Sequence, residues 1–557
     1  MIEGFTRKGL YFIALGGAEE VGYNMFAYIV DGKIIVVDAG YGFLKDDFPG
    51  MEMGLADVSF LETYRDDIEA MFITHGHEDH YGAIGHIWDR FDCPLYAADF
   101  TLGHIKNRLK EYHINDFSRL HSINDNPQIK LNNFTVEFVP LVHSCPQSCG
   151  LLIHTVYGTV LHATDWRFDD DKTAISHTDY TKLKSAAAEG IDIYVGDSTN
   201  MSSDYNEPSE YEIRQSLLEL VPSLSNTVVA TCFASNIVRL ESLILAASAA
   251  GRTPIISGHS LNQNYQIAKN CGYLQDTPPA FDIAKAQDIP SDKALYICAG
   301  SQGDYRSALS RIANGESKDI ILSKGDNIIF SSKIIPGNEE KIERMQEKLR
   351  DMGVNVISSE DYQVHASGHA TPSQIIEMYQ MLKPKVVIPV HGDKRNIRKQ
   401  RKLAKENGVG EVLVVRNGDV VLYHDGNAEI ISEIFTRKLG VDRNKLVPLD
   451  AQLIKNRRRI AYNCSVFISV VFDQQWHLKD LQISSIDILE EVDFIALRDE
   501  IIEEIKKDIS KELVKLNFKE NAVKEYLAAR IRRRIFKQTD IKPVVFMHFY
   551  HETREKE

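Results

Sequence analysis

Short apolar runs that end in an aspartate or a histidine recur through the first 200 residues of the chain. The runs are "KIIVVDAG" (33–40), "AMFITH" (70–75), "FTVEFVPLVH" (134–143), "TVLHATD" (159–165) and "DIYVGDST" (192–199), and they place Asp38, His75, His143, Asp165 and Asp197 at or near their ends. A strand buried in an α/β sheet is such a run, and these sheets carry their ligands at the strand ends. The repeated pattern therefore predicts a buried sheet with a polar rim.

The pattern changes at about residue 201, where strand-like runs alternate with longer helical stretches up to about residue 365. This alternation is typical of an α/β domain with a parallel sheet. The run "KPKVVIPVHGD" (383–393) again brings a histidine, His391, to a strand end, which indicates that the second domain is an insertion. We expect a first domain over 1–200 and 366–430, an inserted domain over 201–365, a linker over 431–450 and a small α+β domain over 451–557.

The charge balance limits the partners that the chain can bind. Its formal net charge is −15, whereas non-specific coating of nucleic acid needs clustered Lys and Arg. Three basic runs stand out against this background, "DKRNIRKQRK" (393–402), "KNRRR" (455–459) and "RIRRR" (530–534). Such a run is more often a solvated helix face than a binding patch.

The sequence also bears on the compartment. No stretch approaches the roughly 18 uninterrupted apolar residues of a membrane span, and "MIEGFTRKGLYFIALGG" lacks the features of a signal peptide. The seven cysteines are scattered and include no CxxC pair. We therefore expect a reduced, cytoplasmic protein without a membrane partner.

The segment "THGHEDHYGAIGH" (74–86) holds four histidines and two acids. His75 and His77 share one face of an extended segment because they are two residues apart, and Asp79 and His80 follow within a turn. Imidazole and carboxylate together suit zinc or manganese. The segment cannot fill two coordination spheres alone, and further ligands are available at the strand ends, namely His143, Asp165 and His391. The alternative is a histidine-rich surface loop.

Motifs in every part of the chain resemble those of one family. They are "LGGAEEVGYNM", "HGHEDH", "VHSCPQSCG", "TDWRFD", "GDSTN", "FASNIVR", "GSQGDYRSALSR", "HASGH", "IPVHGD" and "VKEYLAARIRRRIFKQTDIKP". The core motif resembles that of metallo-β-lactamase-fold nucleases with a β-CASP insertion, and the "FASN", "GSQG" and "HASGH" set resembles ribonuclease J. The resemblance implies an α/β fold, an αββα sandwich with an inserted β-CASP domain and a small α+β C-terminal domain.

The resemblance also implies an activity. It is that of a ribonuclease that degrades RNA from the 5′ end, prefers a 5′-monophosphate, and also cleaves internally, in RNA maturation, including rRNA processing, and mRNA decay. The implied cofactors are two divalent ions per subunit, with Zn²⁺ favoured and Mn²⁺ or Mg²⁺ as alternatives. The implied partners are RNA, further copies of the chain in a homodimer or homotetramer, and other RNA-degradation proteins.

Carried over residue by residue, the resemblance assigns the metal site. One ion would be held by His75, His77 and His143, and the other by Asp79, His80 and His391, with Asp165 bridging both beside a shared hydroxide. Asp38 would order the histidine loop. Asp79 and Asp165 are also assigned to catalysis, together with Asp197 and His369 as the proton donor system for the leaving 3′ oxygen. The alternatives are a helix cap for Asp197 and a buried hydrogen-bonding role for His369.

A pocket for the nucleotide phosphate is implied as well. It would be formed by Ser235, Asn236, His365, Ser367 and Gly368, because hydroxyls, imidazole and loop amides are suitable donors to phosphate oxygens. The alternative for the serines is ordinary turn chemistry. His391 resembles the RNA-acting relatives, since DNA-repair relatives typically carry valine there. The basic run over 393–402 would then lie near the rim of the site.

The sequence departs from the family pattern at Cys145, Gln147 and His259, which puts substrate preference and not catalysis in doubt. Of the remaining histidines, His86 and His162 are interpreted as structural, and His104 and His113 as solvated helix residues.

Three other functions stay open. A 3′-end-processing endonuclease of the same superfamily has no use for a phosphate pocket. An inactive RNA-binding subunit would have lost metal ligands, whereas every expected ligand is present here. A small-molecule hydrolase such as a lactonase would not need the insertion.

Overall fold

The computed structural model describes residues 5–44, 47–124, 127–169, 175–203, 207–286, 288–304, 307–334, 338–486 and 488–552. The chain forms two compact units, the larger made of Met1–Phe43 and Met53–Leu439 and the smaller of Leu44–Glu52 and Gly440–Glu557. Among the described helices, none has the length and the apolar character needed to cross a bilayer.

Two sheets form the centre of the larger unit. The first has the order β23-β22-β1-β2-β3-β6-β7-β8, and the second has the order β21-β20-β13-β12-β11-β10-β9. The strands of the first are β1 (Leu10–Gly16), β2 (Met25–Val30), β3 (Lys33–Val37), β6 (Ile68–Phe72), β7 (Leu95–Ala97), β8 (Leu120–Ser122), β22 (Asp419–His424) and β23 (Asn427–Glu433). Those of the second are β9 (Gln128–Lys130), β10 (Thr135–Pro140), β11 (Cys149–Thr155), β12 (Gly158–Ala163), β13 (Ile193–Asp197), β20 (Val386–Val390) and β21 (Glu411–Val412).

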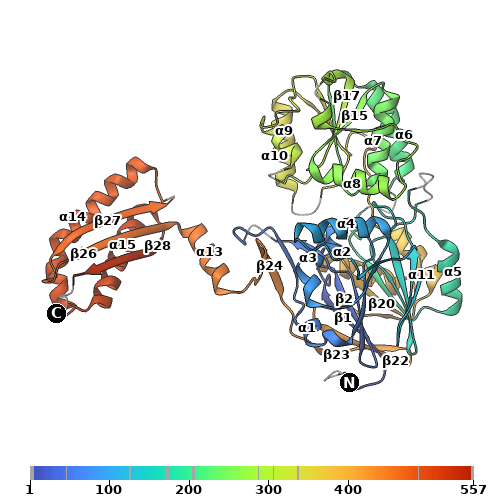
Figure 1. Ribbon diagram of the computed structural model, residues 1–557, viewed down its shortest axis with the longest axis horizontal. Coiled ribbons are helices and arrows are strands. Elements are labelled where there is room, and N and C mark those ends of the chain that lie inside the picture. Colours follow the sequence, from blue (N-terminus) through green and yellow to red (C-terminus); the bar gives the residue numbers. More distant parts are fainter. Residues whose placement is uncertain are drawn as a thin grey trace. The chain divides into compact units, whose positions relative to one another are not determined.

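The two sheets share one apolar core. Phe26 and Val37 of the first sheet belong to the same buried cluster as Leu151 and Val195 of the second. Helices α5 (Tyr180–Glu189), α11 (Pro372–Leu382) and α12 (Lys394–Glu406) cover the other face of the second sheet. Helices α1 (Ser59–Thr63), α2 (Glu78–Tyr81), α3 (Ile84–Ile87) and α4 (Asp99–Glu111) lie beside the first sheet (Figure 1). The predicted α/β sandwich is confirmed, and because central strands are buried on both faces they are continuous apolar runs.

Parallel pairing brings the strand ends to one edge. β12 pairs in parallel with β13, and β13 with β20. In the first sheet β3 and β6 are parallel as well. The polar residues that follow these strands therefore gather at common edges, which is the arrangement that the repeated sequence pattern predicts.

A third sheet is inserted between two neighbouring strands, because the chain leaves the second sheet after β13 and returns at β20. Its order is β16-β15-β17-β14-β18-β19, with all pairs parallel. Its strands are β14 (Val228–Thr231), β15 (Thr253–Ser257), β16 (Phe281–Asp282), β17 (Ala294–Cys298), β18 (Asn327–Phe330) and β19 (Asn355–Ile357). Helices α6 (Glu210–Ser223), α7 (Ile237–Ala249) and α8 (His259–Asn270) pack on one face, and α9 (Ala308–Ala313) and α10 (Glu339–Asp351) on the other (Figure 1).

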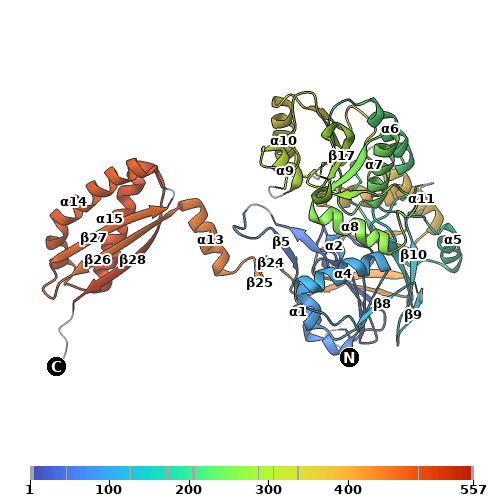
Figure 2. The ribbon, with the colours of Figure 1, turned by 45° about the horizontal axis from the view of Figure 1, so that its top comes forward.

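The smaller unit has its own core. Its sheet has the order β27-β26-β28, formed by β26 (Ser465–Phe472), β27 (Leu478–Ile486) and β28 (Val544–His551). Alternate residues of β26 are buried under α14 (Glu491–Lys515) and α15 (Glu520–Thr539), which share one apolar cluster with the sheet (Figure 2). The smaller unit also contains β25 (Lys445–Pro448) and α13 (Gln452–Asn463). Strands β4 (Tyr41–Phe43) and β5 (Met53–Ala56) belong to the larger unit, and β24 (Lys438–Asp442) spans the boundary at residue 440.

Candidate metal centre and the segments around it

The predicted ligands lie on four segments, each of which leaves the end of a strand. The loop after β6 carries His75 and His77 and continues into α2 with Asp79 and His80, while His143, Asp165 and His391 follow β10, β12 and β20. His391 has a φ of 49°, in the left-handed region that non-glycine residues rarely adopt. The chain thus turns sharply at the end of β20, where the seven side chains converge.

One group of potential ligands contains three imidazoles and one carboxylate. The donor atoms of His75, His77, His143 and Asp165 all lie within 4.8 Å of one another. His77 Nδ1 is 3.2 Å from His75 Nε2 and 3.0 Å from His143 Nε2. Asp165 Oδ2 lies 3.6 Å from His75 Nε2 and 3.7 Å from His143 Nε2. This donor set is of the kind that zinc and related ions take.

A second group shares Asp165 with the first. It contains Asp79, His80, Asp165 and His391. His80 Nε2 lies 3.3 Å from Asp165 Oδ2 and 3.6 Å from Asp79 Oδ2. His391 Nε2 lies 3.1 Å from Asp79 Oδ2, and its Nδ1 lies 3.1 Å from Asp165 Oδ1. Asp165 is thus shared by both groups: its Oδ2 faces His75, His143 and His80, and its Oδ1 faces His391.

The hydrogen bonds on the far side of the imidazole rings are those expected of metal ligands. His143 Nδ1 donates to the carbonyl oxygen of Gly368 at 2.7 Å, so its Nε2 faces the first group with a lone pair. His80 Nδ1 lies 2.7 Å from Asp38 Oδ2, which directs the other ring nitrogen, Nε2, towards the second group. Asp38 also accepts hydrogen bonds from the backbone and hydroxyl of Thr74. The position of Asp38 agrees with its expected role in ordering the histidine loop.

Burial and charge set the protonation of these ligands. Burial holds the pKa of His75 and of His77 well below the ordinary value, and it lowers the pKa of His143 to about 4, which leaves neutral imidazoles. Burial opposes ionisation of Asp165, but His391 and His80 outweigh it and hold its pKa well below the usual range. Burial lowers the pKa of His80 and of His391 too, but the nearby carboxylates outweigh it and raise the first to about 10 and the second well above its ordinary value. These two rings would therefore release a proton when a cation binds.

The site is open on one side. His75, His143 and Asp165 are buried, whereas His77 is half-buried and the side chain of Asp79 is 31% exposed. His369 is also partly exposed, at 21%. A hydrolytic centre needs such a side, because water and substrate must reach the bound ions.

Asp197 and His369 form a close pair beside the second group. His369 Nδ1 lies 2.6 Å from Asp197 Oδ2, while Asp197 Oδ1 accepts a hydrogen bond from the backbone of Thr199 at 2.7 Å. Burial lowers the pKa of His369, but Asp197 and Asp165 outweigh it and raise the pKa above its ordinary value. Asp165, Asp197, His369 and His391 also form a third group of potential ligands. The direct bond between Asp197 and His369 occupies an atom of each, which favours a proton-donor pair over a third metal site.

The predicted phosphate-binding residues come from two segments that meet at Arg239. Ser235 and Asn236 precede α7, and the Asn236 side chain caps this helix by accepting from the backbone of Arg239. Arg239 is fully buried, is paired with Glu210, and donates to the carbonyl oxygen of Val364, next to His365. The meeting of the two segments is the arrangement that a shared pocket requires.

The segment over 365–369 also contacts the metal centre and a carboxylate. Gly368 accepts from His143, as described, and the backbone of Ser367 donates to Glu207 Oε2 at 3.0 Å. Lys333 Nζ donates to Glu207 Oε1 at 3.2 Å. Burial and the nearby charges of Arg239, Lys333 and Arg167 hold the pKa of His365 well below its usual value.

Sequence reasoning missed four of these residues, which are Arg167, Glu207, Arg239 and Lys333. A signal existed for Arg239, since a single arginine interrupts the apolar run "IVRLESLIL" (237–245). The other three, Arg167, Glu207 and Lys333, lie in polar segments, where nothing in the sequence tells which charged side chains meet the segment over 365–369.

One histidine interpretation is wrong. His104 is buried and not solvated, because it packs against Phe100 and Tyr81, and burial lowers its pKa to about 4. His113 is exposed, as predicted. His86 and His162 make structural contacts, with Tyr112 at 2.7 Å and Tyr28 at 2.8 Å.

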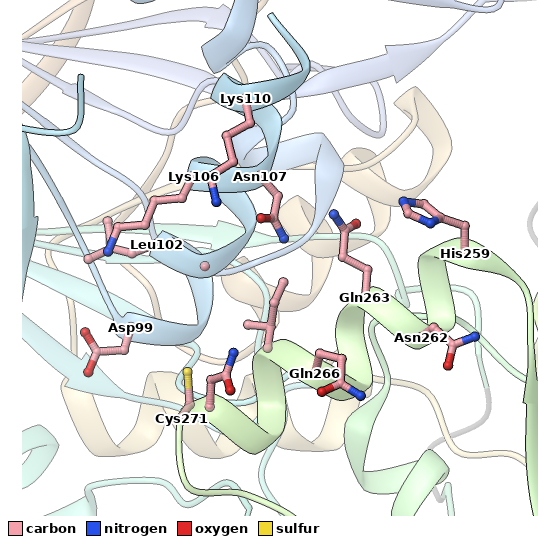
Figure 3. A pocket seen from close by; sticks show the side chains of 13 residues that line it. Asp99, Leu102, Lys106, Asn107, Lys110, His259, Asn262, Gln263, Gln266 and Cys271 are labelled. Carbon is pink, nitrogen blue, oxygen red and sulfur yellow. The ribbon is translucent and has the colours of Figure 1, made fainter. Parts of the chain in front are cut away.

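A groove of about 670 Å³ lies between α4 and α8. Figure 3 shows Lys106, Asn107 and Lys110 of α4 on one side and His259, Gln263 and Gln266 of α8 on the other. A Cβ at Gly103 would lie 2.6 Å from Ile267 Cγ2, so the two helices are in direct contact at the groove. None of the groove residues belongs to a metal-ligand group.

Comparisons with known proteins agree with this geometry. The model of the ribonuclease J beta-CASP domain matches residues 225–349, the metallo-beta-lactamase superfamily model matches 19–214, and the Zn-dependent metallo-hydrolase RNA specificity domain matches 360–415. Ribonuclease J of Sinorhizobium meliloti is 33% identical over 471 residues, 84% of each chain. The chain belongs to the ribonuclease J family.

Other members of the ribonuclease J family are similar over comparable lengths. Ribonuclease J of Mycobacterium tuberculosis is 35% identical and covers 78% of this chain and 79% of its own. Ribonuclease J2 of Bacillus subtilis is 28% identical over 84% and 85%. A crystal structure of a protein of unknown function from Enterococcus faecalis has a TM-score of 0.51 at 16% identity over 75% of this chain and 100% of its own, which shows the fold alone.

Proposed function

We propose that this member of the ribonuclease J family is a metal-dependent ribonuclease that hydrolyses RNA phosphodiester bonds with two divalent ions. The observation that supports this proposal most directly is the position of Asp165. Its buried carboxylate is shared by two groups of imidazole and carboxylate side chains at a partly exposed site. His75, His77 and His143 would hold one ion, and Asp79, His80 and His391 would hold the other. Two such ions activate water and neutralise the charge of the phosphodiester under attack.

His369 and Asp197 serve the leaving group. His369 Nδ1 faces Asp197, so Nε2 is the ring atom available to the substrate. The carboxylates of Asp197 and Asp165 favour the protonated ring, which donates from Nε2 to the departing 3′ oxygen. The partial exposure of His369 lets substrate reach it.

The pocket near the metal centre favours action from the 5′ end. Ser235, Asn236, His365, Ser367 and Gly368 receive the 5′-monophosphate, and the bond between Gly368 and His143 ties this pocket to the ligands. A phosphate held there places the first internucleotide bond at the ions, which gives 5′-to-3′ exonuclease action. Internal cleavage is a second mode for RNA that does not engage the pocket.

The test is a time course on RNA labelled at its 5′ end, with monophosphate and triphosphate forms compared. We expect immediate release of labelled mononucleotide, slower from the triphosphate, with Zn²⁺ or Mn²⁺ supplied. Labelled internal fragments, indifferent to the 5′ group, would instead indicate a processing endonuclease. No cleavage with any metal would indicate an inactive RNA-binding subunit.

The ligand set also bears on the native metal. Imidazole nitrogens outnumber carboxylates in the two groups, and this balance favours Zn²⁺ over Mn²⁺, with Mg²⁺ least suited because it prefers oxygen ligands. Elemental analysis of purified protein distinguishes the three ions.

The smaller unit supports a homodimer or homotetramer. The uncovered face of its sheet carries exposed Phe467, Phe546, Tyr550 and Ile486, and Phe467 stacks on Phe546. Exposed apolar residues grouped in this way mark protein interfaces, for a second copy or for other RNA-degradation proteins. The seven cysteines form no disulfide bond with one another, which fits a reducing cytoplasm. Sedimentation of wild type and a Phe467→Ser variant tests the assembly.

A further inference from the structure

The structure separates the three basic runs of the sequence. In α13, Arg457 pairs with Asp442 at 2.7 Å and Arg458 with Asp47 at 3.4 Å. In α15, Arg530 pairs with Asp508 at 2.8 Å, and Arg534 pairs with Glu500 at 2.5 Å and Glu504 at 3.1 Å. Acids of the smaller unit thus neutralise much of the charge of these two runs.

Helix α12 keeps most of its charge. It has seven cations, Lys394, Arg395, Arg398, Lys399, Arg401, Lys402 and Lys405, and one acid, Glu406. Lys402 pairs with Glu406 at 3.7 Å, and Lys394 lies 3.5 Å from Glu19. Within the part of the chain that the structure describes, Arg395, Arg398, Arg401 and Lys405 have no ion pair. In a chain of net charge −15, this helix is an isolated concentration of positive charge.

The cations of α12 form one surface. Ile397, Gln400, Leu403 and Ala404 are the buried positions of the helix. Arg395, Arg398, Lys402 and Lys405 are exposed and recur every three or four residues, with Lys394 and Arg401 beside them. At a rise of 1.5 Å per residue, the stripe is about 17 Å long.

This basic stripe begins at the rim of the metal centre. Asp393 caps α12 two residues after His391. Asn396 donates to the carbonyl oxygen of Thr199 at 2.8 Å, and the Thr199 hydroxyl lies 2.9 Å from His391 Nδ1. Lys399 donates to Ser202 at 2.8 Å. The first two turns of α12 are therefore fastened to the loop after Asp197, and the stripe runs outward from there.

We propose that the exposed basic stripe of α12 binds the sugar-phosphate backbone of a single-stranded RNA whose reacting bond lies at the metal centre. This inference rests on the proposed ribonuclease function. Lysine and arginine on a helix face bind phosphates without reading sequence. α12 contains no aromatic residue on which a base could stack. The stripe is therefore expected to increase the affinity for longer RNAs, whatever their base sequence.

The test compares substrates of two lengths. The variant Arg395→Gln, Arg398→Gln, Arg401→Gln removes three cations that have no ion pair and no part in the metal centre. We expect KM for an RNA of about thirty nucleotides to rise about tenfold or more, with the salt slope of binding reduced by about two for three lost phosphate contacts. The value of kcat, and KM for an RNA of about four nucleotides, stay unchanged.

Two matched variants serve as controls. Arg344→Gln, Lys348→Gln, Arg350→Gln removes the same charge from α10, an exposed helix on which acids balance the cations. Lys106→Gln, Lys110→Gln removes the lysines of the groove between α4 and α8. For both controls, we expect KM for the long RNA and KM for the short RNA to equal the wild-type values.

Four outcomes would overturn the inference. They are an unchanged KM for the long RNA in the α12 variant, an equal rise in the α10 control, a rise confined to the groove control, and an equal rise in KM for the short and the long RNA in the α12 variant. Fluorescence anisotropy of the long RNA, with EDTA present, measures binding without cleavage. If the wild type binds through α12 but cleaves neither RNA, the proposed activity fails and the RNA-binding stripe stands.

Discussion

The metal centre and the proposed phosphate pocket touch each other, yet their polar groups are arranged in opposite ways. In the metal centre, the imidazoles of His80 and His143 are held from outside by Asp38 and Gly368. Their remaining nitrogens face the other potential ligands, Asp165 and His77 respectively. In the pocket, the backbone of Ser367 and the ammonium of Lys333 are already bonded to Glu207. The first arrangement is completed by a cation, whereas the second already holds an anion of the chain itself.

This difference indicates how much each region must rearrange when its ligand binds. A divalent ion meets ligands whose orientation is fixed in advance, so little rearrangement accompanies binding. In the proposed pocket, a 5′-phosphate would compete with the Glu207 carboxylate for the backbone N–H of Ser367 and the ammonium of Lys333. We therefore expect the metal centre to control whether cleavage occurs and the pocket to adjust which end is chosen.

The largest expected effect is loss of the shared carboxylate. Asp165→Ala removes the group that both ligand sets use, so we expect both ions to be lost and cleavage to fall by about 10³-fold or more. Elemental analysis and an RNA cleavage assay check this, and a thermal melt verifies the fold. Asp79→Ala serves as the comparison, because it lies in one group only. Full metal content with wild-type cleavage in Asp165→Ala would contradict the bridging role.

Next in size is the proton donor. His369→Ala leaves the two ligand groups intact but removes the ring paired with Asp197, so we expect kcat to fall about 10²- to 10⁴-fold. Metal content should match that of the wild type, which separates this loss from that of Asp165→Ala. A variant that loses one ion would place His369 among the ligands instead.

A smaller effect, of opposite sign, is expected at Glu207. Glu207→Gln removes the negative charge that competes for Lys333, so the preference for a 5′-monophosphate over a 5′-hydroxyl should rise about threefold to tenfold, or up to about 1.4 kcal/mol. Ser367→Ala is the matched variant, and we expect it to reduce exonuclease action more than internal cleavage. Equal losses of both modes in Ser367→Ala, or a lowered preference in Glu207→Gln, would count against the pocket.

The smallest expected effect concerns the contact between α4, beside the first sheet, and α8 of the inserted domain. Gly103→Ala places a Cβ against Ile267, so one of the two helices must shift, at a cost of about 1–2 kcal/mol in the free energy of unfolding. Metal content should be unchanged, because the ligands of both ions lie outside the inserted sheet and its helices. Denaturant unfolding measures the change in the free energy of unfolding. An increase would show that the two helices accommodate the added methyl group without strain.

Much of the fold and of the metal centre could be read from the sequence for a simple reason. Asp165, Asp197 and His391 each stand at the end of a buried apolar run, and parallel strands bring such ends to one edge. The order of the runs also indicated the insertion between β13 and β20. His104 was misread because a histidine on a helix gives no sign of which face it occupies, and here that face packs on Phe100 and Tyr81.

The sequence by itself determined which side chains are available to the metal centre and where along the strands they stand, since local apolar patterns and spacing govern strand ends. Only the tertiary structure decided which charges stay unpaired. Arg458 meets Asp47 and Arg534 meets Glu500, whereas Arg395, Arg398 and Arg401 meet no acid among the described residues. These two ion pairs join segments far apart in the chain, so their presence depends on the packing of whole elements and not on a local run of residues.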